Sequence, residues 1–157
     1  MAGRFRAAID GGSRGNPGIA AWGVVVLGDD GAPAERHAGY LGRATNNVAE
    51  WTALVRALDL ALGCGASDVE VLADSELVVK QMRGEYKVRH PDLIPLHAEA
   101  KARTGRIARF RIIHVPRERN KDADKVVNRI LDAAERDPGR DPDPIRETGS
   151  PIDRTPG

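Results

Sequence analysis

The sequence has little of several features that would identify particular classes of protein. Its one cysteine, Cys64, cannot form an intramolecular disulfide, which excludes a disulfide-built fold and makes a reducing cytoplasm the expected location. No apolar run approaches the length of a membrane span or of the hydrophobic part of a signal peptide, so we expect no membrane contact. The net charge of only +1 excludes a broadly basic surface, so a nucleic acid would have to be bound by a local patch.

The composition predicts one folded domain and a tail. Among 157 residues, 41% are hydrophobic and only 4% are aromatic, which is typical of a layered α/β core filled by aliphatic side chains. Residues 137–157 hold five of the ten prolines, mixed with Asp, Arg and Gly. We therefore expect a monomeric domain at 1–136 and a disordered Pro/Asp/Arg-rich tail at 137–157.

Three strands are predicted at the start of the chain. Phe5, Ala7 and Ile9 alternate with other residues along one face, and this strand is expected to end at Asp10 because two glycines follow. Residues 20–27 and 35–41 read as two further strands separated by a turn. Three successive strands with short connections suggest an antiparallel meander.

A helical period follows these strands. Apolar residues recur with helical spacing from Trp51 to Leu62, and glycines end the run. Residues 69–73 form a short apolar strand, which a right-handed crossover would place parallel to an earlier strand, with Asp74 at its end. The remaining elements expected are a helix starting near Ser75, a helix at 93–103, a strand at 107–115 and a helix at 120–136.

Four acidic residues are candidates for catalysis: Asp10, Glu50, Asp74 and Asp124. Each also has an ordinary structural explanation. Asp10 could form a turn, and Asp74 could interact with the following helix N-terminus. Glu50 lies three residues after Asn47, close to a capping-box spacing, and Asp124, like Asp122, lies in the first turn of the last helix.

The joint placement of these acids favours a shared role. In α/β sheets, ligands gather beyond the carboxyl ends of the parallel strands, near helix N-termini. If Asp10 and Asp74 end neighbouring parallel strands, their carboxylates repel unless they are protonated or bridged by a cation. Carboxylates without thiolates or a histidine cluster suit Mg²⁺ or Mn²⁺ better than Zn²⁺. Two such ions, about 3.5–4 Å apart, can promote attack of water on a phosphodiester.

Four segments together resemble the signature blocks of the type 1 ribonuclease H family. They are DGGSRGNPG at 10–18, TNNVAE at 45–50, ADSELV at 73–78 and HVPRERNKDAD at 114–124. They occur in the family's order and span nearly the whole predicted domain. The resemblance implies the ribonuclease H-like α/β fold, a mixed five-stranded sheet of three antiparallel and then two parallel strands, flanked by helices.

The resemblance also implies an activity and its cofactors. It predicts an endoribonuclease that hydrolyses the RNA strand of RNA–DNA hybrids with two Mg²⁺ or Mn²⁺ ions, leaving 5′-phosphate and 3′-hydroxyl ends. Asp10 would be the central bridging carboxylate, and Glu50, Asp74 and Asp124 would complete the metal site. Asp124 is preferred to Asp122 only because the last acid of the family pattern follows an alanine.

Further residues are assigned to the substrate by the same resemblance. Asn16, Asn46 and Asn47, with the backbone of Gly11, Gly12 and Ser13, would contact the RNA strand in the minor groove. Amides suit this role because they can donate to and accept from a 2′-hydroxyl. Thr45 would help to bind a DNA phosphate. Turn and cap chemistry remains the alternative for the asparagines, and helix N-capping the alternative for Thr45.

The chain departs from the best-known bacterial members in three places. Val48 replaces an arginine near the DNA phosphate, and a short loop at 83–90 replaces a helix and a basic protrusion. No histidine lies between Val115 and Asp124, so Arg117 or Arg119 would have to assist there, by charge alone. These features resemble the shorter archaeal and actinobacterial branch.

Two other functions compete with hybrid cleavage. A catalytically silent hybrid-binding module would be favoured if a signature carboxylate were missing, but all four are present. An actin-like ATPase would need a second phosphate loop and a second subdomain, and neither is visible in the sequence. Double-stranded RNA is a second candidate substrate, because Val48 replaces an arginine near the DNA phosphate and so weakens the expected selection for a DNA strand.

Overall fold

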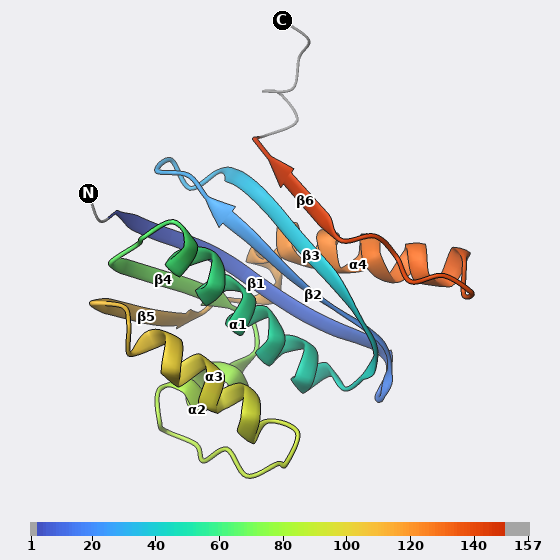
Figure 1. The fold of residues 1–157 in the computed structure, drawn as a ribbon, viewed down its shortest axis with the longest axis horizontal. Helices are drawn as coiled ribbons and strands as arrows, with labels where there is room; N and C mark the ends of the chain where they lie inside the picture. Colours follow the sequence, from blue (N-terminus) through green and yellow to red (C-terminus); the bar gives the residue numbers. More distant parts are fainter. Residues whose placement is uncertain (1–2, 150–157) are drawn as a thin grey trace, which may run out of the picture.

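The computed structural model describes residues 3–149, in which six strands form one mixed sheet and four α-helices cover it (Figure 1). The strands are β1 (Arg4–Gly15), β2 (Gly18–Leu27), β3 (Pro33–Ala44), β4 (Asp68–Ala73), β5 (Arg109–His114) and β6 (Ile145–Thr148). The helices are α1 (Asn46–Gly63), α2 (Glu76–Met82), α3 (Ile94–Thr104) and α4 (Lys121–Arg136), with a short 3-10 helix η1 (Arg117–Arg119).

The strand order is β5-β4-β1-β2-β3-β6. β1, β2 and β3 pair antiparallel, whereas β4 pairs parallel with both β1 and β5. The predicted arrangement of three antiparallel and two parallel strands is therefore confirmed, with β6 added to it. Parallel pairing of β1 with β4 follows from the crossover through α1, which returns the chain to the start of the sheet.

Two hydrophobic clusters lie on opposite faces of the sheet. One cluster joins the sheet to α1, α2 and α3, and the other joins it to α4 (Figure 1). Trp51 is fully buried in the first cluster, where its indole N–H donates to Oε1 of Gln81 at 3.0 Å and so ties α1 to α2. Trp51 therefore lies on the buried face of the predicted helical period. Within residues 3–149, no helix is both long and apolar enough to cross a membrane.

The prediction of disorder from residue 137 onward is wrong for the part that the structure describes. β6 pairs antiparallel with the outer edge of β3, from Ala38 opposite Ile145 to Glu35 opposite Thr148. Arg129 of α4 donates to both carboxylate oxygens of Glu147, at 3.0 and 2.7 Å. Composition alone misses this strand because an unpaired sheet edge and a neighbouring arginine stabilise it. Residues 150–157, the rest of the predicted tail, lie outside the described residues.

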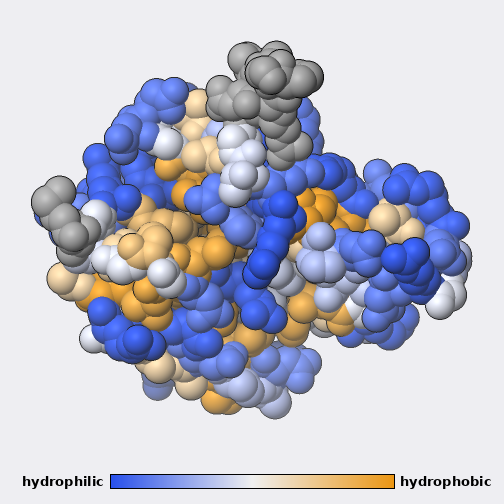
Figure 2. Space-filling model, turned by 45° about the horizontal axis from the view of Figure 1, so that its top comes forward, coloured by the Kyte–Doolittle hydropathy of each residue, from blue (hydrophilic) through white to orange (hydrophobic). Residues whose placement is uncertain are grey.

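The segment between α4 and β6 projects from the body of the molecule. Residues 137–143 are mostly charged or proline, and most are exposed. In Figure 2, hydrophilic residues dominate the lobe on the right, which this segment forms with the end of α4, while hydrophobic residues show mainly over the central body.

The predicted end of the first strand at Asp10 is also wrong. β1 continues to Gly15, with Gly11 opposite Trp22 and Gly12 opposite Ala21. The two glycines do not break the strand, because it keeps its antiparallel partner β2 after it has separated from β4. Asp10 instead marks the point at which the parallel pairing stops.

Candidate active site

Asp10 and Asp74 are brought together by the parallel pair β1 and β4. The last paired residues are Ile9 and Ala73, and each carboxylate follows directly on its own strand. Asp10 lies within β1 and is 8% exposed, whereas Asp74 is the first residue after β4. The two acids therefore lie side by side, as predicted, where the parallel pairing of β1 and β4 ends. β1 itself continues beyond Asp10.

Glu50 reaches the same place from α1 because this helix lies unusually close to β1. A Cβ built at Gly11 would be 2.2 Å from the carbonyl carbon of Ala49, so only glycine permits the contact. The Gly11 N–H donates to Oε1 of Glu50 at 3.3 Å. Thr45, not Asn47, caps α1, and Glu50 lies beyond the first turn, so a capping box does not explain this acid.

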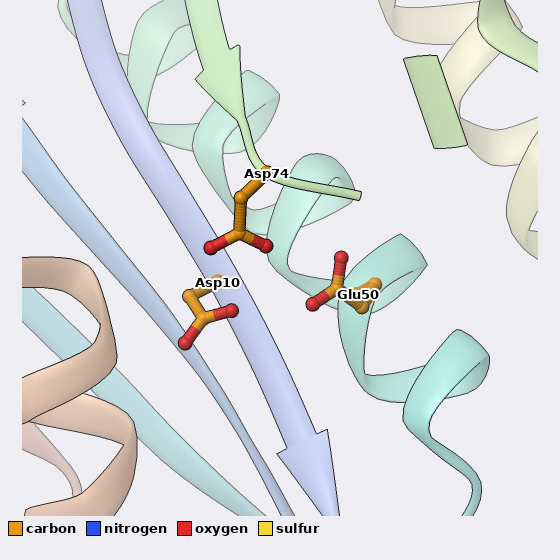
Figure 3. Close-up of side chains that lie close together, drawn as sticks. All are labelled: Asp10, Glu50 and Asp74. Atoms are coloured by element: carbon orange, nitrogen blue, oxygen red, sulfur yellow. The ribbon is translucent and has the colours of Figure 1, made fainter. Parts of the chain in front are cut away.

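The three carboxylates face one shared space (Figure 3). One oxygen from each of Asp10, Glu50 and Asp74 can be chosen so that all three lie within 4.8 Å of one another. Two unit charges about 4 Å apart repel by roughly 4 kcal/mol at the effective dielectric constant of a site near the protein surface. Three ionised carboxylates at this spacing are therefore unstable without protons or a cation.

The pKa values of two of these acids reflect the crowding. Burial, followed by the charges of Glu50 and Asp74, raises the pKa of Asp10 from 3.8 to about 9. Burial and then the charge of Asp74 raise the pKa of Glu50 from 4.5 to about 7, against hydrogen bonds that favour its ionised form. Without a cation, the site therefore retains protons at neutral pH.

Asp124 lies near this group but outside it. It occupies the first turn of α4 with Asp122, and its charge contributes to the raised pKa of Asp10. Asp124 lines the same hollow as the three carboxylates, whereas Asp122 is not part of that lining. Helical spacing could not separate these two acids, and the geometry favours Asp124.

A hollow of about 380 Å³ contains the carboxylates. Its lining includes these predicted site residues: Asp10, Gly11, Gly12, Ser13, Asn46, Asn47, Glu50, Asp74, Arg117 and Asp124. Of the two arginines predicted to assist, only Arg117 belongs to this lining. Arg119 lies at the other end of the same 3-10 helix.

A second hollow, of about 300 Å³, adjoins the first through Asn47, which lines both. Asn16 and Thr45 line this second hollow instead of the first. Three residues of the loop before α3 line it as well: Lys87, Arg89 and His90. The loop is tied to α2, since Nε2 of Gln81 donates to the carbonyl of Lys87 at 3.2 Å.

Several of the predicted substrate residues also have a structural task. Oδ1 of Asn46 accepts from the backbone N–H and the hydroxyl of Ser13, at 2.8 and 3.1 Å. The Asn46 N–H donates to Oδ1 of Asn16 at 3.0 Å, and Oγ1 of Thr45 accepts from the Val48 N–H at 3.2 Å. These contacts confirm the turn and cap chemistry considered for Asn46 and Thr45, and they fix the start of α1 beside β1.

Asn120 is a site residue that sequence reasoning missed. Its amino group donates to Oδ2 of Asp74 at 3.0 Å and to the carbonyl of Ile9 at 2.8 Å, and the residue is only 2% exposed. In the sequence it is only the first residue of the predicted last helix; in the structure it precedes α4, and its side chain forms no capping hydrogen bond. No local pattern distinguishes a capping asparagine from one that points into the core.

The donor set of the site fits a hard divalent cation. It offers carboxylate oxygens and, among the residues lining the hollow, neither histidine nor cysteine. A cation there would relieve the repulsion that raises the pKa of Asp10 and Glu50. Such a centre beside amides and an arginine can act on a phosphate ester.

Comparisons with known proteins agree with this geometry. The sequence model of the reverse transcriptase-like family matches residues 8–130. The bifunctional protein Rv2228c of Mycobacterium tuberculosis is 44% identical over 149 residues, which cover 94% of this chain but only 41% of that protein. Ribonuclease HI of Halobacterium salinarum is 42% identical over 132 residues, covering 84% of this chain and 66% of that protein.

Solved structures give the same result. The N-terminal ribonuclease H domain of Rv2228c, at 44% identity, superposes with a TM-score of 0.82 and covers 88% of this chain and 100% of that one. LC11 ribonuclease H1, solved with an RNA/DNA hybrid, has 40% identity and a TM-score of 0.79, covering 83% and 99% of the two chains. The chain therefore belongs to the type 1 ribonuclease H family.

Proposed function

We propose that this chain is an endoribonuclease that hydrolyses the RNA strand of RNA–DNA hybrids with two bound Mg²⁺ or Mn²⁺ ions. The observation that carries the proposal is the approach of three carboxylate oxygens to within 4.8 Å, in a site that raises the pKa of Asp10 to about 9. This costly arrangement suits a site that is completed by divalent cations. LC11 ribonuclease H1, which shares the fold, was solved with the substrate class proposed here.

The acids would hold the ions in distinct positions. The family resemblance assigns Asp10 the central role among the ligands, and Glu50 and Asp74, whose oxygens lie within 4.8 Å of it and of each other, would hold the ions with it. Asp124, which lines the same hollow from the first turn of α4, is assigned as the fourth ligand. When bound, the ions would lower the pKa of a water ligand and stabilise negative charge on the leaving oxygen.

The proposed reaction is the hydrolysis of one phosphodiester bond of the RNA strand. The water oxygen loses a proton to solvent and bonds to phosphorus, while the bond between phosphorus and the 3′ oxygen breaks. The 3′ oxygen takes up a proton from solvent, which leaves a 5′-phosphate and a 3′-hydroxyl. Arg117 lines the hollow and would stabilise the additional negative charge on the phosphate. A guanidinium remains protonated at all relevant pH values, so Arg117 acts through charge and hydrogen bonds, not by proton transfer.

The two adjoining hollows suit the two strands of a hybrid. The proposed contact with the RNA strand is formed by residues that line the first hollow: Gly11, Gly12, Ser13, Asn46 and Asn47. Asn16 lines the second hollow, but its Oδ1 accepts from the Asn46 N–H, so it is proposed to contact the RNA strand beside Asn46. The amino group of Asn46, which its structural hydrogen bonds do not use, can donate to a 2′-hydroxyl. Thr45 and the basic loop residues Lys87 and Arg89 line the second hollow, where phosphates of the DNA strand would lie.

The proposal also covers the extent of the domain, its oligomeric state and its location in the cell. We propose that residues 1–136 carry the catalytic machinery, that β6 adds an edge strand to the same domain, and that the chain acts as a monomer. Cys64 is exposed and unpaired in the described part of the chain, which suits a reducing cytoplasm.

A cleavage panel tests this function. The protein is incubated with Mg²⁺ or Mn²⁺ and with labelled hybrid, RNA duplex, DNA duplex or single-stranded RNA of one sequence, and the product ends are determined. We expect cleavage of the RNA strand of the hybrid, with 5′-phosphate and 3′-hydroxyl ends. Binding of the hybrid without cleavage would support the silent binding module instead. Cleavage of RNA duplex at a comparable rate would show that the DNA strand is not selected.

A further inference from the structure

Asn120 is a buried polar residue that contacts the acid cluster but takes no part in the proposed hydrolysis. It lies between η1 and α4, and its side chain is almost wholly excluded from solvent. Asparagine is among the best helix-capping residues, yet its side chain forms no capping hydrogen bond with α4. The side chain is directed into the protein instead.

The two hydrogens of its amino group bind strand β1 and the residue that follows β4. One is donated to the carbonyl of Ile9 at 2.8 Å, and the other to Oδ2 of Asp74 at 3.0 Å. Ile9 and Ala73 are the last pair of the parallel register, so Asp10 and Asp74 are the next residue on each strand. The amino group therefore ties the Asp74 carboxylate to the backbone next to Asp10, where the two strands separate.

Asn120 also connects these strands to α4. The Asp124 N–H donates to the Asn120 carbonyl at 3.2 Å, which places the first turn of α4 relative to the same residue. Asn120 thus contacts the Asp74 side chain, the backbone carbonyl that precedes Asp10 and the backbone N–H of Asp124. It therefore helps to position three proposed metal ligands. Such contacts to ligand side chains commonly determine how tightly a metal is bound.

We propose that Asn120 is a positioning residue, which fixes Asp74 relative to Asp10 so that both carboxylates are arranged for a divalent cation before it binds. This inference rests on the proposed metal-dependent function. A neutral amide suits the task because it restrains one oxygen of Asp74 without supplying a positive charge that would compete with the cation. A lysine or arginine would compete in this way, and an aspartate would add a like charge and remove the donor.

The remaining atom of the side chain supports this role. Oδ1 of Asn120 is buried and accepts no hydrogen bond within the described residues. The orientation of the amide is therefore set by its two donated bonds, not by its oxygen. Buried polar groups are usually fully paired, so an incompletely paired amide is more readily explained by its contact with Asp74 than by stability alone.

The test measures Mn²⁺ binding in the absence of nucleic acid. The full chain and the variants Asn120→Ala and Asn120→Leu are titrated with MnCl₂ by isothermal calorimetry, after circular dichroism has shown that each is folded. Leucine has the same branching as asparagine but no hydrogen-bond donor and a larger volume, so it leaves no cavity and serves if the alanine variant does not fold. We expect the Kd for Mn²⁺ to rise about tenfold or more in both variants.

Ile130→Ala is the matched control. Ile130 is buried in α4, 1% exposed, and packs in the cluster on that face of the sheet without belonging to the hollow. It should lower the melting temperature while leaving the Kd for Mn²⁺ within about twofold of that of the unmodified chain. A comparable weakening in Ile130→Ala would overturn the proposal, because metal binding would then follow general stability.

Activity provides a second readout. In the Asn120 variants, the Mg²⁺ concentration for half-maximal hybrid cleavage should rise about tenfold, with the KM for hybrid at saturating Mg²⁺ nearly unchanged. Unchanged Mn²⁺ affinity in a folded Asn120 variant would refute the positioning role. If Mn²⁺ binding depends on Asn120 but no hybrid is cut, the inference holds and the proposed function fails.

Discussion

Gly11 and Ala49 are in direct backbone contact, and a Cβ at Gly11 would lie 2.2 Å from the Ala49 carbonyl carbon. This contact brings Glu50 to the acid cluster, because Glu50 is the next residue of α1. A glycine that reads in the sequence as a turn former is therefore required by the approach of a helix to a strand. The position of the third carboxylate depends on the absence of a side chain at residue 11.

Substitution Gly11→Ala should displace α1 from β1. We expect it to destabilise the fold by about 1–3 kcal/mol, the usual range for overpacking in a core. Cleavage activity should fall by at least about tenfold in the fraction that remains folded, because Glu50 moves with the helix. Thermal unfolding and hybrid cleavage measure the two effects. Gly63→Ala, at the end of α1 with open space around it, should change neither.

Asp10→Asn should stabilise the metal-free protein at neutral and alkaline pH. The folded-state pKa of Asp10, about 9, lies above its unfolded value of about 3.9, so folding requires proton uptake between these values. Each unit of this difference corresponds to about 1.4 kcal/mol, and the effect grows as the pH rises from about 4 toward 9. The asparagine variant does not titrate at residue 10, so it does not lose this stability as the pH rises.

Thermal melts in EDTA at pH 4, 7 and 8.5 measure this dependence. The variant should exceed the unmodified chain in melting temperature at pH 7 and 8.5, and the difference should largely vanish at pH 4. Added Mg²⁺ should raise the melting temperature of the unmodified chain much more than that of the variant. A variant that is less stable at pH 8.5 would show that Asp10 is not destabilised by its neighbours.

The variants Asp124→Asn and Asp122→Asn should differ in cleavage activity, although both acids lie in the first turn of α4. Asp124 lines the hollow, so its loss should lower kcat by about tenfold or more at low Mg²⁺. Asp122 lies in the same first turn but is not part of the lining, so its variant should retain kcat within about twofold. Steady-state cleavage of hybrid over a range of Mg²⁺ concentrations makes the comparison. Equal losses in both variants would mean that helix stability, not metal binding, is affected.

Arg117→Ala and Arg119→Ala should likewise differ. Loss of a charge-assisted contact to phosphate, about 1.5 kcal/mol or more, should lower kcat/KM for hybrid about tenfold in the Arg117 variant. Arg119→Ala should stay within about twofold. Arg117→Lys should recover part of the loss, since it keeps the charge but not the planar pair of donors. The opposite ranking of the two alanine variants would assign the role to Arg119.

Much of the fold could be predicted from the sequence because local periodicity specifies its elements. The alternation at Phe5, Ala7 and Ile9 and the helical spacing from Trp51 to Leu62 both correspond to observed elements, β1 and α1. β6 could not be predicted, because its four residues are stabilised by the edge of β3 and by Arg129, which lie far away in the sequence. A polar segment of this composition carries no local signal for such pairing.

The site was predictable to different degrees. The proximity of Asp10 and Asp74 follows from parallel strands that end together, a rule independent of family. Glu50 could be placed only by resemblance, because its position depends on the contact between Gly11 and Ala49. Asn120 was missed because its sequence context is that of the start of a helix, and only tertiary packing turns its amide toward Asp74.

The most direct test is single-turnover cleavage of labelled hybrid by the unmodified chain and by Asp10→Asn, at increasing Mg²⁺ and at protein concentrations above the measured Kd for hybrid. We predict that the unmodified chain cuts the RNA strand only when Mg²⁺ or Mn²⁺ is present. The variant should bind hybrid with similar affinity but cut it at least about a thousandfold more slowly, which corresponds to about 4 kcal/mol of transition-state stabilisation. Cleavage in EDTA, or cleavage by the variant within tenfold of the normal rate, would contradict a metal-dependent site centred on Asp10.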